Sequence, residues 1–427
     1  MNKNNESKSF GQFILLWLTQ SLSALGSAMT SYALVLWLYG ESGSALYTAM
    51  LTITSYAPYV LLSIFAGALC DRFDKKNTML ICDSIAALCT ITVILLFACN
   101  ALQVWHLYIV NAIGGLMNTV QQPASEIAST ALVPEKHYQK IGGLRYFSSS
   151  LSSILTPVIA TAVYSFSGLE AVLTVDLLTF AVAFITLMFF IRIPKQSAES
   201  AELSLIKSAK SGLDFLKSHK QVLMLIMYLS AINLVASMYE AVLPAMVLSR
   251  KGGGTQALGA VSTCVGATTL IGSIIATLMP KPKSRRRVIC LSLLFSMSTE
   301  NFFLAFGQTP LLWCTGAVLG WILIPMMSAN LDVIMRTKVP CHMQGRVYSA
   351  RNTLQFFTIP LGNFLGGLAV DTFAEPLMAA MPHNSLMCNI FGSGKGSGAA
   401  LIFFIIGIMG VAVCLIFNSN KHIKKIE

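Results

Sequence analysis

Twelve long apolar stretches alternate with short polar segments along the chain, and this alternation limits its fold more than any other feature. Each stretch is long enough to cross about 30 Å of hydrocarbon as a helix. No Lys or Arg lies inside a stretch, apart from Arg351 at the first position of the eleventh. The pattern predicts an all-α membrane protein with twelve transmembrane helices. They are expected at roughly 12–38, 45–69, 78–99, 104–125, 146–165, 169–191, 221–248, 257–279, 288–307, 310–332, 351–370 and 397–418.

Basic residues fall almost entirely in alternate gaps between these stretches, and this distribution predicts their orientation. Of 29 Lys and Arg residues, all but Arg250, Lys251 and Lys395 lie in the gaps on one side. Because basic residues are enriched in cytoplasmic loops, both termini are expected in the cytoplasm. Only 11% of residues are charged and 55% are hydrophobic, so the net charge of +11 indicates loops facing an anionic leaflet, not a nucleic-acid-binding surface.

The sequence carries no signature of an enzyme, a metal site or an ATP-driven pump. Most of the ten Cys residues fall within predicted spans or cytoplasmic loops, so we expect free, packed thiols and no disulfides. There is no Cys/His or HExxH spacing that would indicate a metal site, and no nucleophile elbow or Walker-type loop. We therefore expect no cofactor, no metal and no use of ATP in this chain.

The longest cytoplasmic connection divides the chain into two halves of six spans. Residues 192–220 are polar at first and then amphipathic, with apolar residues at helical spacing, as in a helix that lies on a membrane surface. Its simplest role is a covalent tether between the two halves. We expect an N-terminal bundle at 1–191, a linker with an amphipathic helix at 192–220 and a C-terminal bundle at 221–427.

An internal repeat relates the two halves. Glu126 and Arg145 recur 206 residues later as Asp332 and Arg351, so that in each half a carboxylate ends one span and an Arg opens the next. Parallel repeats of this kind are typical of transporters built from two bundles. We expect these four residues, with Asp83, to form cytoplasmic latches. Simple pairing of the acids with loop Arg and Lys is the alternative.

The sharpest local motif is GALCDRFDKK, which follows the second predicted span. It resembles the loop motif between helices two and three of the major facilitator superfamily. The resemblance implies a gating role for Gly67, Asp71, Arg72, Lys75 and Lys76. Gly67 allows close approach of a helix, and Asp71 caps a helix N-terminus or pairs with a cation there. The three basic residues meet the inner leaflet or a carboxylate.

Further stretches resemble the macrolide-efflux-like branch of the drug exporters in this superfamily. They include ALVPEKHYQKIGGLRY, VLTVDLLTFAVAF, VPCHMQGRVYSARN, IPLGNFLGGLAVD and GSGKGSGAALIF. The resemblance implies export of small hydrophobic compounds through the cell membrane by alternating access, driven by a proton gradient. It also implies a functional monomer whose partners are its substrate and membrane lipids.

Two departures from the family pattern leave the direction of transport and the coupling ion open. Proton-linked members usually carry an Arg in the fourth helix shortly before a Gly pair, where this chain has Asn111. Antiporters favour a Gly-rich run around a Pro in the fifth helix, whereas Ser, Thr and Ala surround Pro157 here.

Three carboxylates lie deepest in the predicted spans: Asp176, Glu240 and Glu300. A charge at the bilayer centre costs roughly 2.5–3.5 kcal/mol on insertion scales, so such a group normally faces a partner or a wet cavity. We expect at least one of the three to carry the transported proton. They could equally attract a cationic substrate, or only order the helices around them.

Two other functions fit the same sequence. One is uptake, or export of a lipid, siderophore or peptide, by the same fold. The other is a membrane receptor or assembly factor that transports nothing, against which the loop motif and the paired halves argue. A transport assay with a substrate gradient separates these functions from drug export.

Overall fold

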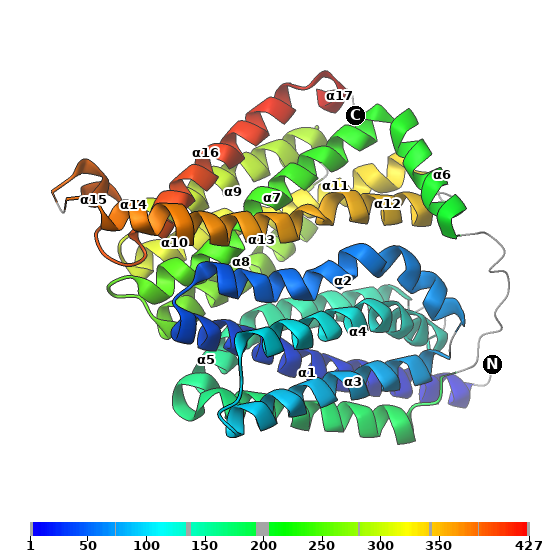
Figure 1. Cartoon of the computed structure of the whole chain (residues 1–427). Helices are drawn as coiled ribbons and strands as arrows, with labels where there is room; N and C mark the ends of the chain where they lie inside the picture. The colour runs from blue at the N-terminus through cyan, green and yellow to red at the C-terminus, as the bar shows by residue number, and fades with distance from the viewer. Residues whose placement is uncertain are drawn as a thin grey trace. The chain divides into compact units, whose positions relative to one another are not determined.

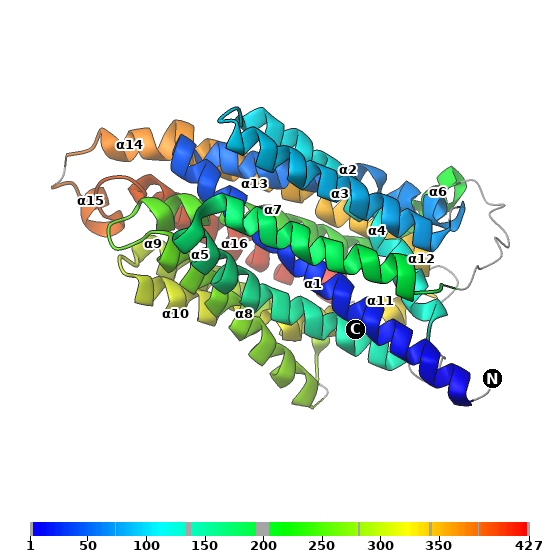
Figure 2. The same cartoon turned by 90° about the horizontal axis from the view of Figure 1, so that it is seen from below.

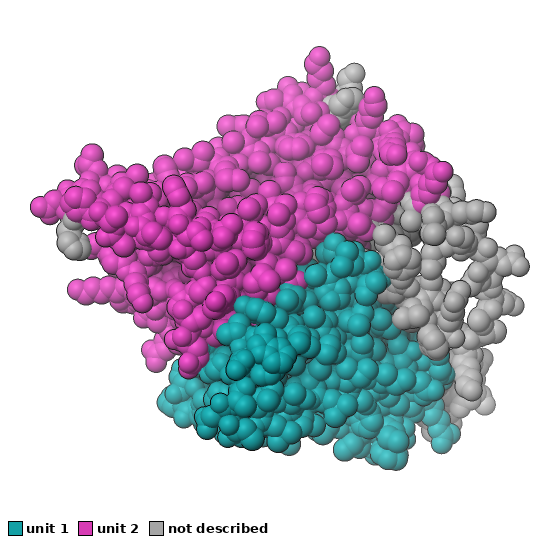
Figure 3. All heavy atoms as spheres, viewed as in Figure 1, with its two compact units in different colours: residues 1–37, 54–205 teal, residues 38–53, 206–427 magenta. Residues whose placement is uncertain are grey.

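The computed structural model describes residues 3–72, 74–133, 138–193, 205–280, 282–340, 344–382 and 384–424. Within these ranges all regular structure is helical, which confirms the predicted all-α class. The chain forms two compact units, coloured separately in Figure 3. Unit 1 comprises residues 1–37 and 54–205, and unit 2 comprises residues 38–53 and 206–427. One boundary falls inside the predicted linker, and the segment 38–53 leaves the N-terminal half to join unit 2.

The helices of unit 1 are shown in the blue to green part of Figure 1. They are α1 (Lys3–Ser42), α2 (Ala45–Arg72), α3 (Lys75–Ala98), α4 (Val104–Ala131), α5 (Tyr138–Ile185) and the π-helical turn η2 (Thr186–Phe190), with the ends of α1 and α2 belonging to unit 2. The long α5 is two helices joined at Gly168, whose φ of 75° and ψ of −172° are not helical. Glycine adopts positive φ without a steric penalty. The predicted fifth and sixth spans therefore meet at this residue.

Unit 2 holds the remaining helices. They are α6 (Leu205–Ser218), α7 (Lys220–Ser249), α8 (Thr255–Leu278), α9 (Arg285–Phe306), α10 (Pro310–Trp321), α11 (Ile324–Lys338), α12 (Gln344–Phe356), α13 (Thr358–Leu368), η4 (Ala369–Ala374), α14 (Glu375–Ala379), α15 (Leu386–Phe391), α16 (Ser397–Ser419) and α17 (Lys421–Lys424). The helical segment of the eleventh span runs on to Ala379, beyond its predicted end at residue 370. Two acidic residues, Asp371 and Glu375, therefore lie on a helix and not in a loop.

Ten helical segments of the described residues are long and apolar enough to cross a membrane. The segment Phe147–Phe190 counts once although it contains parts of two predicted spans, and α4 is not among the ten. The structure thus supports a multi-pass membrane protein, and the number twelve stays a prediction.

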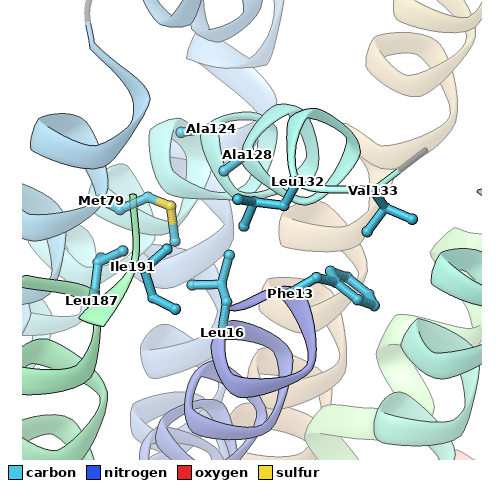
Figure 4. Packing of buried hydrophobic residues seen from close by; sticks show 9 residues of the cluster. All are labelled: Phe13, Leu16, Met79, Ala124, Ala128, Leu132, Val133, Leu187 and Ile191. Atoms are coloured by element: carbon cyan, nitrogen blue, oxygen red, sulfur yellow. The ribbon is translucent and has the colours of Figure 1, made fainter. Parts of the chain in front are cut away.

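An apolar core in unit 1 joins the starts of α1 and α3 to the ends of α4 and η2 (Figure 4). Leu16 of α1 points toward Leu132 at the end of α4, and Met79 of α3 lies beside Leu187 and Ile191. All of these side chains are at most 2% exposed. Burial of apolar surface is the main favourable term in such packing.

Close helix contacts organise unit 2. Helix α13 packs along α7, and α16 packs along α9 (Figure 1). Helix α10 packs beside α8, as Figure 2 shows from below. Glycine permits this spacing. A Cβ atom on Gly362 of α13 would lie 2.3 Å from the carbonyl oxygen of Leu234, and one on Gly410 of α16 would lie 2.9 Å from Cβ of Met297. Larger residues at these positions would force the helices apart.

Candidate functional site

Glu300 of α9 is a buried carboxylate held against the end of α10. Its Oε1 accepts a hydrogen bond of 2.8 Å from Nε1 of Trp321. A Cβ atom on Gly320 would lie 2.6 Å from Oε2, so glycine leaves the space that the carboxylate fills. The side chain is only 5% exposed. Burying an unpaired charge is costly. Among the described residues, no Lys or Arg pairs with the Glu300 carboxylate. Such a group is chemically suited to bind and release a proton.

Glu240 of α7 belongs to the same neighbourhood but has a different environment. The buried Tyr239 beside it interacts electrostatically with both Glu240 and Glu300. Glu240 itself is exposed, and no hydrogen bond to its carboxylate is found in the described part of the chain. Because a carboxylate facing lipid is costly, we expect its exposed side to face water. The structure thus brings two of the three predicted acids together, one buried and one exposed.

Asp176, the third predicted acid, lies in unit 1 among hydroxyl groups from α1 and α3. Ser27 of α1 donates to its Oδ1 at 3.0 Å, and Thr90 of α3 donates to its Oδ2 at 3.1 Å. The side chain is 6% exposed. A hydroxyl rotates to donate to a carboxylate or to accept from a carboxylic acid. This environment can therefore satisfy Asp176 in either protonation state.

Asp83, predicted as part of a cytoplasmic latch, is held by two amides. Gln121 of α4 donates to its Oδ1 at 2.5 Å, and Gln20 of α1 donates to its Oδ2 at 3.3 Å. The side chain is 6% exposed. These contacts connect α1, α3 and α4 inside unit 1. In the described part of the unit the partners of Asp83 are amides and not Arg or Lys.

The residues of the internal repeat are described to different extents. In unit 2, Asp332 of α11 and Arg351 of α12 attract each other electrostatically, and Arg351 Nε donates to Gln355 Oε1 at 3.0 Å. In unit 1, Glu126 acts electrostatically on Tyr59 of α2. The side chain of Arg145 lies outside the described residues. The second pair of the repeat is therefore close together, and the first stays a prediction.

The described half of the loop motif ties helices together within unit 1. Asp74 caps α3, because its Oδ1 accepts from the backbone N–H of Asn77 at 3.0 Å. Lys76 Nζ donates to the carbonyl oxygens of Met188 and Ile191 at 2.9 and 2.7 Å. A cation at the carbonyl end of a helix is favourable. Lys75 is half-buried. The side chains of Gly67, Asp71 and Arg72 lie outside the described residues.

Two acids that sequence reasoning missed each accept backbone N–H groups from the start of a helix in unit 2. Asp371 of η4 accepts from Ala45 and Leu46 at the start of α2, at 3.1 and 2.9 Å. Glu375 of α14 accepts from Gly396 and Ala399 around the start of α16, at 3.0 and 3.1 Å. They were missed because the eleventh span was predicted to end at residue 370. The acid that closes the stretch IPLGNFLGGLAVD was the available signal.

Arg250 follows α7 and is buried despite its charge. Its Nη1 donates to the carbonyl oxygen of Gly307 at 2.6 Å, and its Nη2 donates to that of Phe391. Burial lowers the pKa of Arg250 to about 10, while the negative charge of Glu375 partly opposes this shift. The guanidinium is therefore still charged at neutral pH, and its hydrogen bonds tie the ends of α7, α9 and α15 together.

Metal and disulfide chemistry is absent from the described residues. No group of three or more His, Cys, Asp or Glu side chains among them could hold a metal ion. The eight Cys residues in this part of the chain are free thiols.

Comparison with known proteins places these features in context. The family model described as Major Facilitator Superfamily matches residues 16–363. Macrolide efflux protein A of Streptococcus pyogenes is 25% identical over 376 residues, which are 87% of this chain and 92% of that protein. The multidrug efflux pump Tap of Mycolicibacterium fortuitum is 22% identical over 376 residues, 84% of this chain and 90% of the pump. A solved mutant of the nucleoside transporter NupG aligns with a TM-score of 0.69 at 13% identity, over 96% of this chain and 99% of that one, a likeness of fold alone.

Proposed function

Because this chain belongs to the Major Facilitator Superfamily, it is a membrane transporter and not an enzyme, and we propose that it exports small hydrophobic compounds of the macrolide or drug type. The support is its similarity, over most of both chains, to macrolide efflux protein A and to the pump Tap. In this proposal both termini lie in the cytoplasm, and bundles 1–191 and 221–427 alternate between two states as one monomer. Residues 192–220 connect the two bundles.

Export is coupled to proton entry, with Glu300 as the residue that carries the proton. The supporting observation is the buried position of its carboxylate, which accepts a hydrogen bond from Trp321 and fills the space left by Gly320. A buried carboxylate is stable when protonated, and its ionised form needs water or a cation nearby. Glu240, exposed and close to the same Tyr239, supplies the group that a cationic substrate contacts. Asp176 is the second proton candidate.

Transport in everted membrane vesicles tests the proposal. With an acidic interior, vesicles containing the protein should accumulate a radiolabelled macrolide, and Glu300→Gln should bind the drug but lose pH-driven accumulation. Asp176→Asn and Glu240→Gln, made singly and together with Glu300→Gln, show which acid is essential. If the triple variant still concentrates drug on a pH gradient, these acids are not the proton path.

The same vesicles separate the alternative functions. Loss of drug from preloaded everted vesicles, in place of accumulation, would identify an uptake carrier. No movement of macrolides, lipids, siderophores or peptides in either direction would favour a receptor or assembly factor. Drug susceptibility and intracellular accumulation in cells with and without the protein give the matching result in vivo.

A further inference from the structure

Two long helices change unit partway along their length. The boundary between unit 1 and unit 2 falls after Trp37 in α1 and before Thr54 in α2. The tip of this helical hairpin, residues 38–53, therefore packs with unit 2 although the rest of both helices belongs to unit 1. We call residues 38–53 the hairpin tip. If the two units move relative to each other, α1 and α2 must either bend or release the hairpin tip from the rest of unit 2. The contacts of the tip must then be able to open and close.

The strongest polar contact of the hairpin tip is with Asp371. Both oxygens of this carboxylate are used, because Oδ1 accepts from the Ala45 N–H at 3.1 Å and Oδ2 accepts from the Leu46 N–H at 2.9 Å. The Ser44 hydroxyl donates to Oδ2 at 2.5 Å. A carboxylate at a helix N-terminus satisfies N–H groups that have no partner within the helix and gains from the helix dipole. Asp371 thus caps α2 from another element of unit 2.

Two further contacts hold the tip in the same place. The Tyr39 hydroxyl, near the end of α1, lies 3.0 Å from the carbonyl oxygen of Ala245 and 2.5 Å from the Ser249 hydroxyl. A Cβ atom on Gly367 would lie 2.7 Å from Cα of Leu46, so α13 and α2 touch at their backbones. Water can satisfy the polar groups of these hydrogen bonds when the tip leaves, and apolar residues of the tip are buried as well. We expect the hydrogen bonds to set how readily the contact opens.

Glu375 provides an internal comparison. It caps the start of α16 by the same chemistry, but α16 lies wholly within unit 2. Because Glu375 and α16 belong to the same unit, we expect this cap to stay closed when the units move relative to each other. Asp371 and Glu375 are four residues apart on one short segment. Glu375 caps a helix that stays within unit 2, whereas Asp371 caps α2, which continues into unit 1.

We propose that Asp371 is a positioning residue that latches the hairpin tip to the rest of unit 2 in one state of the transport cycle and releases it in the other. By the orientation given above, this end of α2 faces the outside, so release of the latch exposes the buried face of the tip to external water. This inference rests on the alternating-access part of the proposed function. It does not depend on the identity of the substrate or the ion.

Cysteine accessibility tests the latch directly. Ala49, on the buried face of the tip, is 2% exposed. Ala49→Cys in a chain without the ten native cysteines is therefore protected while the latch is closed. In intact cells, a membrane-impermeant maleimide should label this cysteine roughly tenfold faster in Asp371→Asn, the change that about 1.4 kcal/mol produces. Gly367→Ala, which presses on Leu46, should also speed labelling.

The controls separate a latch from general damage. Glu375→Gln weakens the cap of α16 by removing its charge, and Gly362→Ala disturbs the packing of α13 against α7 away from the tip. Neither should raise the labelling rate beyond the variation between repeat measurements of the parent. Unfolding temperature in detergent is measured for every variant. If Asp371→Asn is not found in the membrane in normal amount, Ser44→Ala gives the deciding rate. This change removes the hydrogen bond to Asp371 together with the one that the Ser44 hydroxyl accepts from the Tyr47 N–H.

Two results would overturn the proposal. One is unchanged labelling in Asp371→Asn, or in Ser44→Ala where that variant decides. The other is equal acceleration in the Glu375→Gln and Gly362→Ala controls. Labelling needs no substrate, so a rise in labelling with no drug transport by the parent would keep the latch and reject the proposed substrate.

Discussion

A single missing side chain explains how a carboxylate is accommodated in unit 2. Gly320 leaves space for Oε2 of Glu300, and Trp321, the next residue, donates to Oε1. The same stretch of α10 therefore supplies both the space and the donor. One turn earlier on this helix, Gly316 makes a similar contact with an apolar partner, because a Cβ atom there would lie 2.7 Å from Cβ of Phe303. Substitutions at the two glycines therefore separate the effect of crowding in α10 from the effect of displacing the Glu300 carboxylate.

We predict that Gly320→Ala abolishes pH-driven efflux while Gly316→Ala leaves most of it. Both substitutions overpack the same helix and should each cost about 1–3 kcal/mol of stability. Only the first displaces the Glu300 carboxylate. Drug efflux from cells and unfolding temperature in detergent are measured side by side for the two variants. Equal loss of efflux in both would mean that the packing of α10, and not the position of Glu300, limits transport.

At the level of elements, the loop motif divides into two chemical parts. Its second half is local and structural, because Asp74 caps α3 and Lys76 binds the carbonyl end of η2. For its first half, with Asp71, the gating role that the family resemblance implies stays a prediction. Two aspartates three residues apart are therefore expected to fail in different ways when they are substituted.

We predict that Asp71→Asn abolishes efflux with normal abundance and unfolding temperature, whereas Asp74→Ala lowers stability and keeps efflux. Loss of an N-cap costs roughly 0.5–2 kcal/mol, and Asp74→Ser, which retains a capping oxygen, should restore most of it. The measurements are thermal unfolding in detergent and drug efflux normalised to protein amount. Normal efflux by Asp71→Asn would remove the gating role, and an unchanged unfolding temperature in Asp74→Ala would remove the capping role.

For the whole molecule, the alternating access proposed above requires two units that change state together, and the charged residues of the internal repeat are candidates for this coupling. Asp332 and Arg351 attract each other within unit 2. Exposed ion pairs contribute only about 0–1 kcal/mol. A change of that size still shifts a two-state equilibrium that is close to balance. The same reasoning applies to Glu126 and Arg145 of the first half.

We predict that Glu126→Gln biases the transporter toward the inward-open state without unfolding it. A cysteine introduced near the cytoplasmic ends of the helices should then react faster from the cytoplasmic side, in a chain without the native cysteines. The charge swap Glu126→Arg with Arg145→Glu should return the rate to that of the parent. Equal rates in all three proteins would leave these residues as ordinary loop charges.

The helices and their membrane character could be predicted from the sequence because both depend on local properties. An apolar stretch of about 20 residues must form a helix in a bilayer whatever its neighbours are. The loop motif and the long stretches shared with the exporters likewise lie in continuous sequence. The predicted acids Asp176, Glu240 and Glu300 were visible for the same reason, since an acid in an apolar stretch stands out without any tertiary information.

The partners of these acids were decided only by the tertiary structure. Asp83 meets Gln20, 63 residues earlier, and Asp371 meets Ser44, 327 residues earlier. No periodicity or motif relates residues so far apart, because their contact depends on how packed helices bring their faces together. The segment 38–53 joins unit 2 for the same reason. Sequence determined the helices and the family of this protein, and packing determined which charges the helices hold and which end of α2 is capped by Asp371.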